Sequence, residues 1–522
     1  MDIGHAFLAA AARTPGATAF VDGDLRRTYA EWRDEILPVA GGLSAMGLGR
    51  GDTLSAVMVN GHETATLYWA CHMLGAVFAP FNWRATEDEI AYVLRDADAR
   101  LVAFDMSGVA ARAAAGALGF GPDRLIAAGG ADGGTAFEAL AKSVPLAGPA
   151  GAADAEICLL LYTSGTTGRP KGVPRSHGAE RTAAASCIAN QRYRFGDVAL
   201  GVMPLFHTMG IRVLLCAAML SGTFVAMRRF DPSAALALIG EERVSSLFLV
   251  PTMFHDMLHH DDCASADLSS VRNVAYAGMP MTGVLETQCR DRFAPEVFCN
   301  YYGSSEIFTF AFCDRLEAKP GCAGYAGLNQ EIRVVRADAE GRAGPDDVVP
   351  AGEVGEVIAS MRSAEAFAGY RNRPEADAKA IRQGWYFTGD LGRLDADGAL
   401  YLCGRIDDMI ISGGENIHPE EVEDTLAACP GVLQAAVVGL PDGRLGHAVT
   451  AFIEPADATL CAEALDAHCR ASPLARFKRP RAYIFVRRLP RSASGKLLRR
   501  LLREGAYEPL DGSDPHSQER TS

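Results

Sequence analysis

The chain has 522 residues and a formal net charge of −14, and 49% of its residues are apolar. This length and composition predict a globular protein of about two to four domains or subdomains with a large core. The acidic balance argues against a surface for nucleic acid or for an anionic membrane, so we expect no nucleic-acid partner. An anionic substrate would then depend on local Lys or Arg side chains.

Thirteen cysteines are scattered along the chain without a C-x-x-C pair, which favours reduced thiols over a zinc ribbon or a disulfide scaffold. The N-terminus has an acidic residue at once and no basic segment, so it is a poor signal peptide. The most apolar long run, 213–227, is interrupted by Ser, Gly and Thr and is shorter than the roughly 20 residues of a membrane span. We expect a cytoplasmic protein without a membrane span.

Short β-branched or aromatic runs alternate with Ala-rich helical stretches in the first part of the chain. A strand is expected at 53–59 before a helix at 63–76, and a strand at 156–163 leads into a glycine-rich loop. This alternation predicts α/β architecture with buried sheets. Further strands are expected at 245–251, 273–278 and 297–303.

Closely spaced strands with Gly/Asp turns over 324–362 predict a small barrel-like β subdomain. After residue 405 the pattern changes to a capped helix at 419–432, followed by strands with one more helix among them, which is typical of a small α+β unit. The predicted fold is therefore of the α/β class. A large N-terminal domain (1–405) of layered α/β sheets is followed by a small mobile α+β C-terminal domain (406–510) and a disordered tail (511–522).

The stretch 162–173, YTSGTTGRPKGV, predicts a phosphate-binding loop. Glycines let the backbone approach a ligand, amides and hydroxyls can surround a phosphate, and Lys171 adds positive charge. The spacing differs from G-x-x-x-x-G-K-[ST], because Lys171 lies between Pro170 and Gly172. A plain glycine-rich turn is the alternative, but it would not require this composition. The expected phosphate ligands are Thr163, Ser164, Gly165, Thr166, Thr167, Gly168 and Lys171.

This loop resembles the signature of the adenylate-forming superfamily, which contains acyl-CoA synthetases, peptide-synthetase adenylation domains and luciferases. Further stretches match in the family's order and cover most of the chain, with aryl-CoA ligases such as 4-chlorobenzoate–CoA ligases the most similar. The resemblance implies that ATP converts a carboxylate into an acyl-adenylate with release of pyrophosphate, and that coenzyme A then displaces AMP. The matching stretches are PLFHTMG (204–210), NYYGSSE (300–306), YFTGDLGRL (386–394), 404–423 and RSASGKLLR (491–499).

The first step brings a carboxylate to a phosphate, so positive groups and Mg²⁺ must neutralise the two negative charges. The resemblance implies that Glu306 is the Mg²⁺ ligand and that Lys496 bridges the carboxylate and the α-phosphate. It also places His207 beside the acyl group, where amino-acid-activating domains carry Asp. The structural alternatives are a solvated Glu306 or Lys496 and a packed core histidine at His207.

The resemblance also supplies a nucleotide site. Tyr302 would lie against the adenine, and Asp390 would accept the ribose hydroxyls through its two oxygens. Arg405 would reach the ribose or the phosphates, and a surface ion pair is the alternative for Asp390 and Arg405. Gly303, Ser304 and Ser305 are expected to complete the site.

Aromatic side chains are expected to wall the acyl pocket. They favour a flat ring through stacking, but they would equally line an aliphatic tunnel. The expected pocket residues are His207, Phe248, Gly278, Tyr301, Phe308 and Thr309.

Cationic side chains complement the phosphates of coenzyme A, and Arg84 and Arg479 are the candidates. Gly413 and Gly414, followed by Glu415, would leave a narrow passage for the pantetheine arm.

Two positions bear on how the second step would work. Asp407 matches the family's hinge, about which the C-terminal domain would rotate between the two steps. Leu445 stands where the chlorobenzoate ligase has an aromatic residue that stacks on the adenine of coenzyme A, so that contact is in doubt.

Other readings stay open at this stage. One is a synthetase for short- or medium-chain aliphatic acids, and another is a non-catalytic nucleotide-binding regulator with the same fold. A third is an adenylation domain that serves a carrier protein. His255 and His259 have the i, i+4 spacing of a helical metal site but lack a clear third ligand. A homodimer is also left open.

Overall fold

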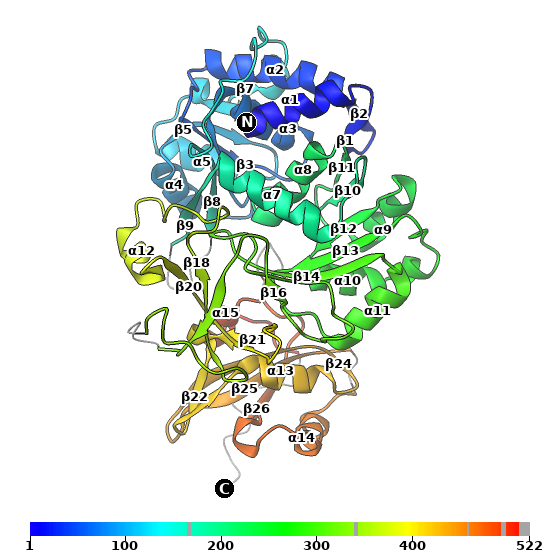
Figure 1. Cartoon of the computed structure of the whole chain (residues 1–522), viewed down its shortest axis with the longest axis vertical. Helices are drawn as coiled ribbons and strands as arrows, with labels where there is room; N and C mark the ends of the chain where they lie inside the picture. The colour runs from blue at the N-terminus through cyan, green and yellow to red at the C-terminus, as the bar shows by residue number, and fades with distance from the viewer. Residues whose placement is uncertain (164–168, 339–342, 457–458, 492–496, 511–522) are drawn as a thin grey trace. The chain divides into compact units, whose positions relative to one another are not determined.

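The computed structural model describes residues 1–163, 169–338, 343–456, 459–491 and 497–510. The chain forms two compact units, Met1–Ile332 with Ala359–Tyr386, and Arg333–Ile358 with Phe387–Ser522. Figure 1 labels the helices and strands of both units.

A seven-stranded sheet in the first unit has the order β7-β6-β5-β3-β4-β8-β9. Its strands pair in parallel except β8 and β9, which form an antiparallel hairpin. The strands are β3 (Thr53–Val57), β4 (Val77–Pro80), β5 (Ala99–Phe104), β6 (Leu125–Ala127), β7 (Thr135–Ala136), β8 (Ile157–Thr163) and β9 (Lys171–Ser176). The intervening helices are α3 (His62–Leu74), α4 (Glu87–Asp96), α5 (Ala110–Ala117), η1 (Pro122–Arg124) and α6 (Phe137–Leu140).

A nine-stranded sheet follows the order β16-β15-β14-β13-β12-β10-β11-β1-β2. Its central strands are parallel, and antiparallel strands close both edges. The strands are β1 (Thr18–Asp22), β2 (Leu25–Thr28), β10 (Val198–Gly201), β11 (Thr223–Ala226), β12 (Ser246–Leu249), β13 (Asn273–Ala277), β14 (Val297–Tyr302), β15 (Ala311–Cys313) and β16 (Tyr325–Ala326). The other helices of this unit are α1 (Ile3–Arg13), α2 (Tyr29–Ala45), α7 (His177–Gln191), α8 (Thr208–Met219), α9 (Pro232–Glu241), α10 (Pro251–Leu258), η2 (Asp261–Ala264), α11 (Gly283–Phe293) and α12 (Pro374–Ala380).

Helix α3 joins these two sheets into one core. It contacts β4 of one sheet and β1 of the other, and every one of its residues except Glu63 is buried. A helix that is covered on all sides needs no polar face, so the apolar residues of its sequence, HETATLYWACHML, are not confined to one stripe. By contrast, α2 and α4 start at capping boxes, Thr28 with Glu31 and Thr86 with Glu89, which stabilise their exposed first turns.

The closely spaced strands expected over 324–362 belong to a five-stranded sheet with the order β17-β18-β20-β19, in which β21 also pairs with β20. Its strands are β17 (Ile332–Val335), β18 (Gly355–Ser360), β19 (Ile381–Arg382), β20 (Trp385–Leu394) and β21 (Leu400–Arg405).

The end of the second unit is an α+β fold on a sheet with the order β23-β22-β25-β24, in which β26 pairs with β25. Side chains of β24 alternate between two cores: Val437 packs with α13 and α14, whereas Ala436 and Val438 pack with α15. The elements are η3 (Ile406–Asp408), β22 (Ile410–Ser412), β23 (Glu415–Ile417), α13 (Pro419–Ala427), β24 (Val432–Asp442), β25 (Gly446–Pro455), α14 (Ala462–Ala471), η4 (Arg476–Lys478), β26 (Ala482–Phe485) and α15 (Arg499–Arg503).

The predicted fold class is confirmed, with differences at the ends of elements. The helix expected at 419–432 ends at Ala427, because Pro430 and Gly431 follow and cannot continue it. The domain boundary after residue 405 stays a prediction, and the tail 511–522 lies outside the described residues.

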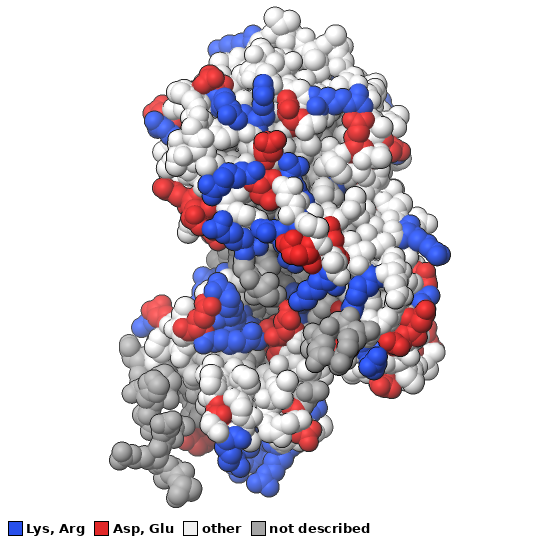
Figure 2. Space-filling model, turned by 90° about the vertical axis from the view of Figure 1, so that its left-hand side faces the viewer, with Lys and Arg blue, Asp and Glu red and all other residues white. Residues whose placement is uncertain are grey.

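Charged side chains of both signs are interspersed on the face of the molecule drawn in Figure 2. Among the described residues, no helix is both long and apolar enough to cross a membrane.

Candidate active site

A buried carboxylate shared by two arginines lies at the base of the candidate site. Glu180 on α7 accepts a hydrogen bond from Arg175 Nε on β9 at 2.8 Å and one from Arg212 Nη2 on α8 at 3.0 Å. The three side chains are at most 1% exposed. Burial alone would raise the pKa of Glu180, but the positive charges of Arg212 and Arg175 lower it. Glu180 is therefore ionised, and its two ion pairs link α7 to β9 and to α8.

Arg175 extends this network to the loop after β14. Its Nη1 donates to the backbone oxygens of Glu306 at 2.8 Å and of Glu365 at 2.6 Å. The Glu365 carboxylate in turn accepts from the backbone N–H of Thr309 at 3.0 Å. Burial raises the pKa of Glu365, and a hydrogen bond from Ser186 and the nearby arginines counteract part of that rise. Segment 306–309 is thus held from two sides by the buried side chains of Arg175 and Glu365.

Tyr370 brings the expected metal ligand and the phosphate-loop lysine together. Its hydroxyl donates to Glu306 Oε1 at 2.7 Å, and Lys171 Nζ lies 4.7 Å from the centroid of its ring. Burial, and then the negative charge of Glu306, raises the pKa of Tyr370, so the phenol stays a donor. Our sequence reasoning missed Tyr370. Its only signal is the tyrosine in FAGYR (367–371), which is distant in sequence from Glu306.

The described flanks of the phosphate loop are fixed by the β8–β9 hairpin. Thr163 and Lys171 face each other in the pairing register of the two strands. The backbone oxygen of Pro170 accepts from the Tyr92 hydroxyl at 3.1 Å, and that of Gly172 accepts from the Arg371 N–H at 2.9 Å. The expected ligands Ser164, Gly165, Thr166, Thr167 and Gly168 lie outside the described residues.

The loop at Gly303 is too tight for a side chain. A Cβ at Gly303 would stand 1.8 Å from the backbone oxygen of Phe308. The Ser304 N–H donates to the Ile307 oxygen at 2.9 Å, and Ser304 Oγ accepts from the Glu306 N–H at 3.2 Å. Gly303 is expected to belong to the nucleotide site, and the close approach of the Phe308 backbone is a second reason why this position requires glycine. The neighbours Tyr302 and Ser305 are 8% and 9% exposed.

Three aromatic rings gather where the acyl pocket is expected. The centroids of Phe248 and Tyr301 lie 5.1 Å apart, and that of Phe308 lies 6.4 Å from Phe248 and 6.2 Å from Tyr301. Arg212 Cζ lies 4.5 Å from the Phe308 centroid, so the buried network also contacts this wall.

The other expected pocket residues come from nearby ends of elements. His207 is the half-buried N-cap of α8, and its Nδ1 accepts from the Met209 N–H at 3.3 Å. Gly278 follows β13 with a φ of +88° and is exposed, whereas Thr309 is fully buried.

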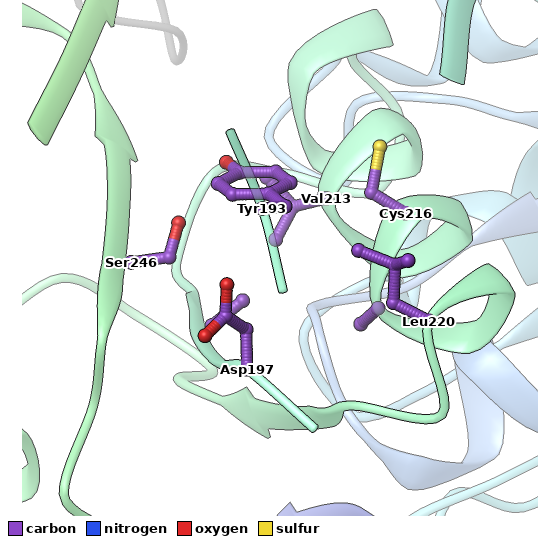
Figure 3. Close-up of a pocket in the computed structure, with 8 residues that line it drawn as sticks. Tyr193, Asp197, Val213, Cys216, Leu220 and Ser246 are labelled. Atoms are coloured by element: carbon purple, nitrogen blue, oxygen red, sulfur yellow. The ribbon is translucent and has the colours of Figure 1, made fainter. Parts of the chain in front are cut away.

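A small cavity beside α8 does not fit an acid substrate. Tyr193, Cys216 and Ser246 are among its lining residues, and Figure 3 shows them around it. Its volume of about 10 Å³ has room for about one water molecule.

The expected ribose residues form an ion pair in the second unit. Arg405 Nε lies 3.1 Å from Asp390 Oδ1, and the two residues pair across β20 and β21. The expected hinge residue Asp407 lies in η3 directly after β21. Lys496 lies outside the described residues.

The expected coenzyme A residues of this unit have backbone roles of their own. Gly413 and Gly414, with φ of +60° and +86°, form the two-residue turn between β22 and β23, which suits glycine. The Gly413 N–H donates to the Leu445 oxygen at 2.8 Å. Glu415 is exposed, and Arg479 is half-buried with its Nε donating to the Leu474 oxygen at 3.3 Å.

Arg499, three positions after Lys496, binds a carboxylate cluster that our sequence reasoning missed. It lies 2.7 Å from Glu423, 3.2 Å from Glu420 and 3.4 Å from Asp408. Burial raises the pKa of Glu420 to about 7. Because Asp408 adjoins the expected hinge, the start of α15 is tied to that hinge within this unit.

The histidine pair that raised the question of a metal site lacks further ligands among the described residues. The rings of His255 and His259 stack 4.2 Å apart, and His259 Nδ1 pairs with the His255 oxygen at 2.8 Å. Where the chain is described, the potential ligands that do converge are His72, Cys158 and His177, which are buried.

Family models match both parts of the chain. The model of the AMP-binding enzyme matches residues 7–371, and the model of the AMP-binding enzyme C-terminal domain matches residues 421–496.

Similar proteins include several CoA ligases. A feruloyl-CoA synthase of an Amycolatopsis species is 35% identical over 93% of this chain and 95% of its own. A 4-chlorobenzoate–CoA ligase of an Arthrobacter species is 35% identical over 94% of this chain and 93% of its own. The structure of o-succinylbenzoate–CoA synthetase of Bacillus subtilis in complex with its acyl-adenylate intermediate has a TM-score of 0.84 and 28% identity. That similarity covers 97% of this chain and 99% of the other.

We predict that Gly303→Ala disables the site without unfolding the protein. The new methyl group would push segment 306–309 away, and a misplacement of about 1 Å can lower a rate about 10²-fold. The measurement is acid-dependent exchange of pyrophosphate into ATP. Gly283→Ala is the matched control, because a Cβ there meets no atom within 4 Å. A Gly303→Ala rate within twofold of the wild type would contradict this reading.

We also predict that Glu180→Gln lowers the free energy of unfolding by about 3–5 kcal/mol near pH 7, because it breaks a buried ion pair. The pKa of Glu180 is lowered from 4.5, so its stabilisation is present above that value and is lost as the pH falls through the folded-state pKa. Denaturant titrations should therefore show the difference between variant and wild type shrinking in acid. A difference that stays constant down to about pH 3 would rule out an ionised Glu180.

Proposed function

The chain belongs to the AMP-binding enzyme family and is an AMP-forming acid–CoA ligase, and we propose that its acid is a small aromatic or heteroaromatic carboxylate. ATP and coenzyme A are its co-substrates. The observation that carries the proposal is the group of rings from Phe248, Tyr301 and Phe308, since aromatic side chains favour a flat substrate. The relatives named for feruloyl, chlorobenzoate and succinylbenzoate substrates support the same choice.

The residues around Glu306 fit a magnesium ion. A carboxylate oxygen is a hard ligand, and Mg²⁺ commonly binds one or two carboxylates together with substrate phosphates. When bound, the ion would neutralise phosphate charge as the acid attacks. Tyr370 fixes one Glu306 oxygen, and Arg175 fixes the Glu306 backbone, so the chain itself sets where the carboxylate stands.

In our proposal, two lysines neutralise the remaining negative charge of the acid and the phosphates in the first step. Lys171, held beside Tyr370, would contact the departing pyrophosphate, and Lys496 would bridge the acid and the α-phosphate. Tyr302, Asp390 and Arg405 would bind the adenosine. His207 at the start of α8 would shield the reacting carboxylate from water.

The second step requires a domain movement in this proposal. Domain 406–510 would rotate about Asp407, withdraw Lys496 and bring the Gly413–Gly414 turn to the pantetheine arm. The ion pair between Arg499 and Asp408 would make the start of α15 and the hinge move together. Arg84 and Arg479 would bind the phosphates of coenzyme A.

We further propose a cytoplasmic location, where ATP and reduced coenzyme A are available. Because the proposed residues all come from one chain, a homodimer would carry two separate sites.

A pyrophosphate-release assay with a panel of carboxylic acids tests the substrate class. We expect benzoates, cinnamates or heteroaryl acids to exceed short and medium aliphatic acids in kcat/KM at least tenfold, about 1.4 kcal/mol of transition-state binding. Preference for aliphatic acids would replace the proposal with an aliphatic acyl-CoA synthetase. No pyrophosphate release with any of the acids would favour a non-catalytic regulator, and formation of the adenylate without a CoA product would favour a carrier-protein partner.

Lys496→Ala tests the two-step mechanism. It should slow adenylate formation at least about 10²-fold, because a charge aimed at the transition state is lost. Preformed acyl-AMP should still react with coenzyme A at close to the wild-type rate. Lys142→Ala, which removes an exposed lysine, is the charge-matched control. Equal losses in both half-reactions would count against separate roles for the two domain orientations.

A further inference from the structure

Two guanidinium groups lie close to one indole in the first unit. Arg84 Cζ lies 4.0 Å and Arg229 Cζ 4.8 Å from the centroid of the Trp83 ring. Trp83 and Arg84 follow β4 of one sheet, and Arg229 follows β11 of the other. Both strands lie in parallel pairings, so the cluster sits beyond the carboxyl ends of strands, where α/β folds bind ligands.

Among the described residues, these two arginines lack the carboxylate partners that their neighbour Arg228 has. Where the chain is described, neither Arg84 nor Arg229 forms an ion pair, whereas the adjacent Arg228 pairs with Asp22 at 2.7 Å and with Glu63 at 3.2 Å. Burial, and then the positive charge of Arg229, lowers the pKa of Arg84. Two like charges held close together repel each other, and an anion bound by both would relieve that repulsion.

The surroundings fix the cluster and suggest which kind of anion fits. Arg229 Nη2 donates to Ser107 Oγ at 3.0 Å, and the Arg84 N–H donates to Asn82 Oδ1 at 3.0 Å. Next to Ser107, the Met106 side chain is 61% exposed. Cationic forks beside an indole and exposed apolar surface suit a nucleotide, which has phosphates and a planar base.

We propose that Arg229 is a phosphate-binding residue for coenzyme A, held together with Arg84 by Trp83 and directed at the 3′-phosphate of the nucleotide. This inference rests on the proposed role of Arg84 in binding coenzyme A. The 3′-phosphate is a monoester with a charge of about −1.5 to −2 at pH 7 and three terminal oxygens. Each phosphorus of the diphosphate bridge carries a single negative charge, so the monoester complements a pair of guanidinium groups better.

The test compares coenzyme A with dephospho-coenzyme A, which lacks the 3′-phosphate. We expect the wild type to prefer coenzyme A in kcat/KM. Arg229→Ala should raise the KM for coenzyme A roughly tenfold, the loss of one charge-assisted hydrogen bond, while the KM for dephospho-coenzyme A stays unchanged. Arg229→Lys keeps the charge without the planar fork, so it should fall between the two. Arg228→Ala, which removes a neighbouring charge that already has partners, should leave both KM values within twofold of the wild type.

A binding measurement and the first half-reaction separate this inference from its alternatives. Adenosine 3′,5′-bisphosphate should inhibit the wild type and lose potency roughly tenfold in Arg229→Ala. Acid-dependent pyrophosphate exchange, measured without coenzyme A, should be unchanged in that variant. Equal KM changes for both thiols, no change for either, or a loss of exchange would each overturn the assignment. Absence of exchange in the wild type would instead refute the proposed function.

Discussion

The ion pairs of one buried carboxylate, Glu180, are the interaction on which the rest of the site depends. Arg175 and Arg212 both bind it, and each carries a different part of the site: Arg175 holds the backbone at Glu306, and Arg212 packs on Phe308. The proposed metal ligand and the aromatic wall are therefore both positioned by the same buried carboxylate. A site that must hold an acid, an ion and a nucleotide together benefits from such a rigid base.

Burying this network costs desolvation energy, and apolar side chains of the same volume could be as stable. We therefore interpret Glu180 as fixing positions more than as adding stability. The fold supports this, because Arg175 lies on β9, Glu180 on α7 and Arg212 on α8, so the network joins a strand end to two packed helices. The Lys171 end of β9 and the start of α8 carry residues that we propose contact the substrates.

How much the sequence predicted depends on how local the signal is. The strand–helix alternation and the motifs around Lys171 and Glu306 are contiguous, so the fold class was predicted correctly and these two residues could be named as candidates. Glu180 and Tyr370 were not found, because their partners lie far away in sequence and a buried glutamate reads locally like an ordinary helical one. The proximity of Arg84 and Arg229 was not predicted for the same reason, since they follow β4 and β11, which belong to different sheets.

A double-mutant cycle between Arg175→Met and Arg212→Met, read out as kcat/KM of acid-dependent pyrophosphate exchange, tests the central claim most directly. Because both arginines act through the same carboxylate, the account predicts a coupling energy of about 1 kcal/mol or more between the two changes. Additive losses, with a coupling below about 0.3 kcal/mol, would mean that Glu306 and Phe308 are positioned independently and would contradict the account.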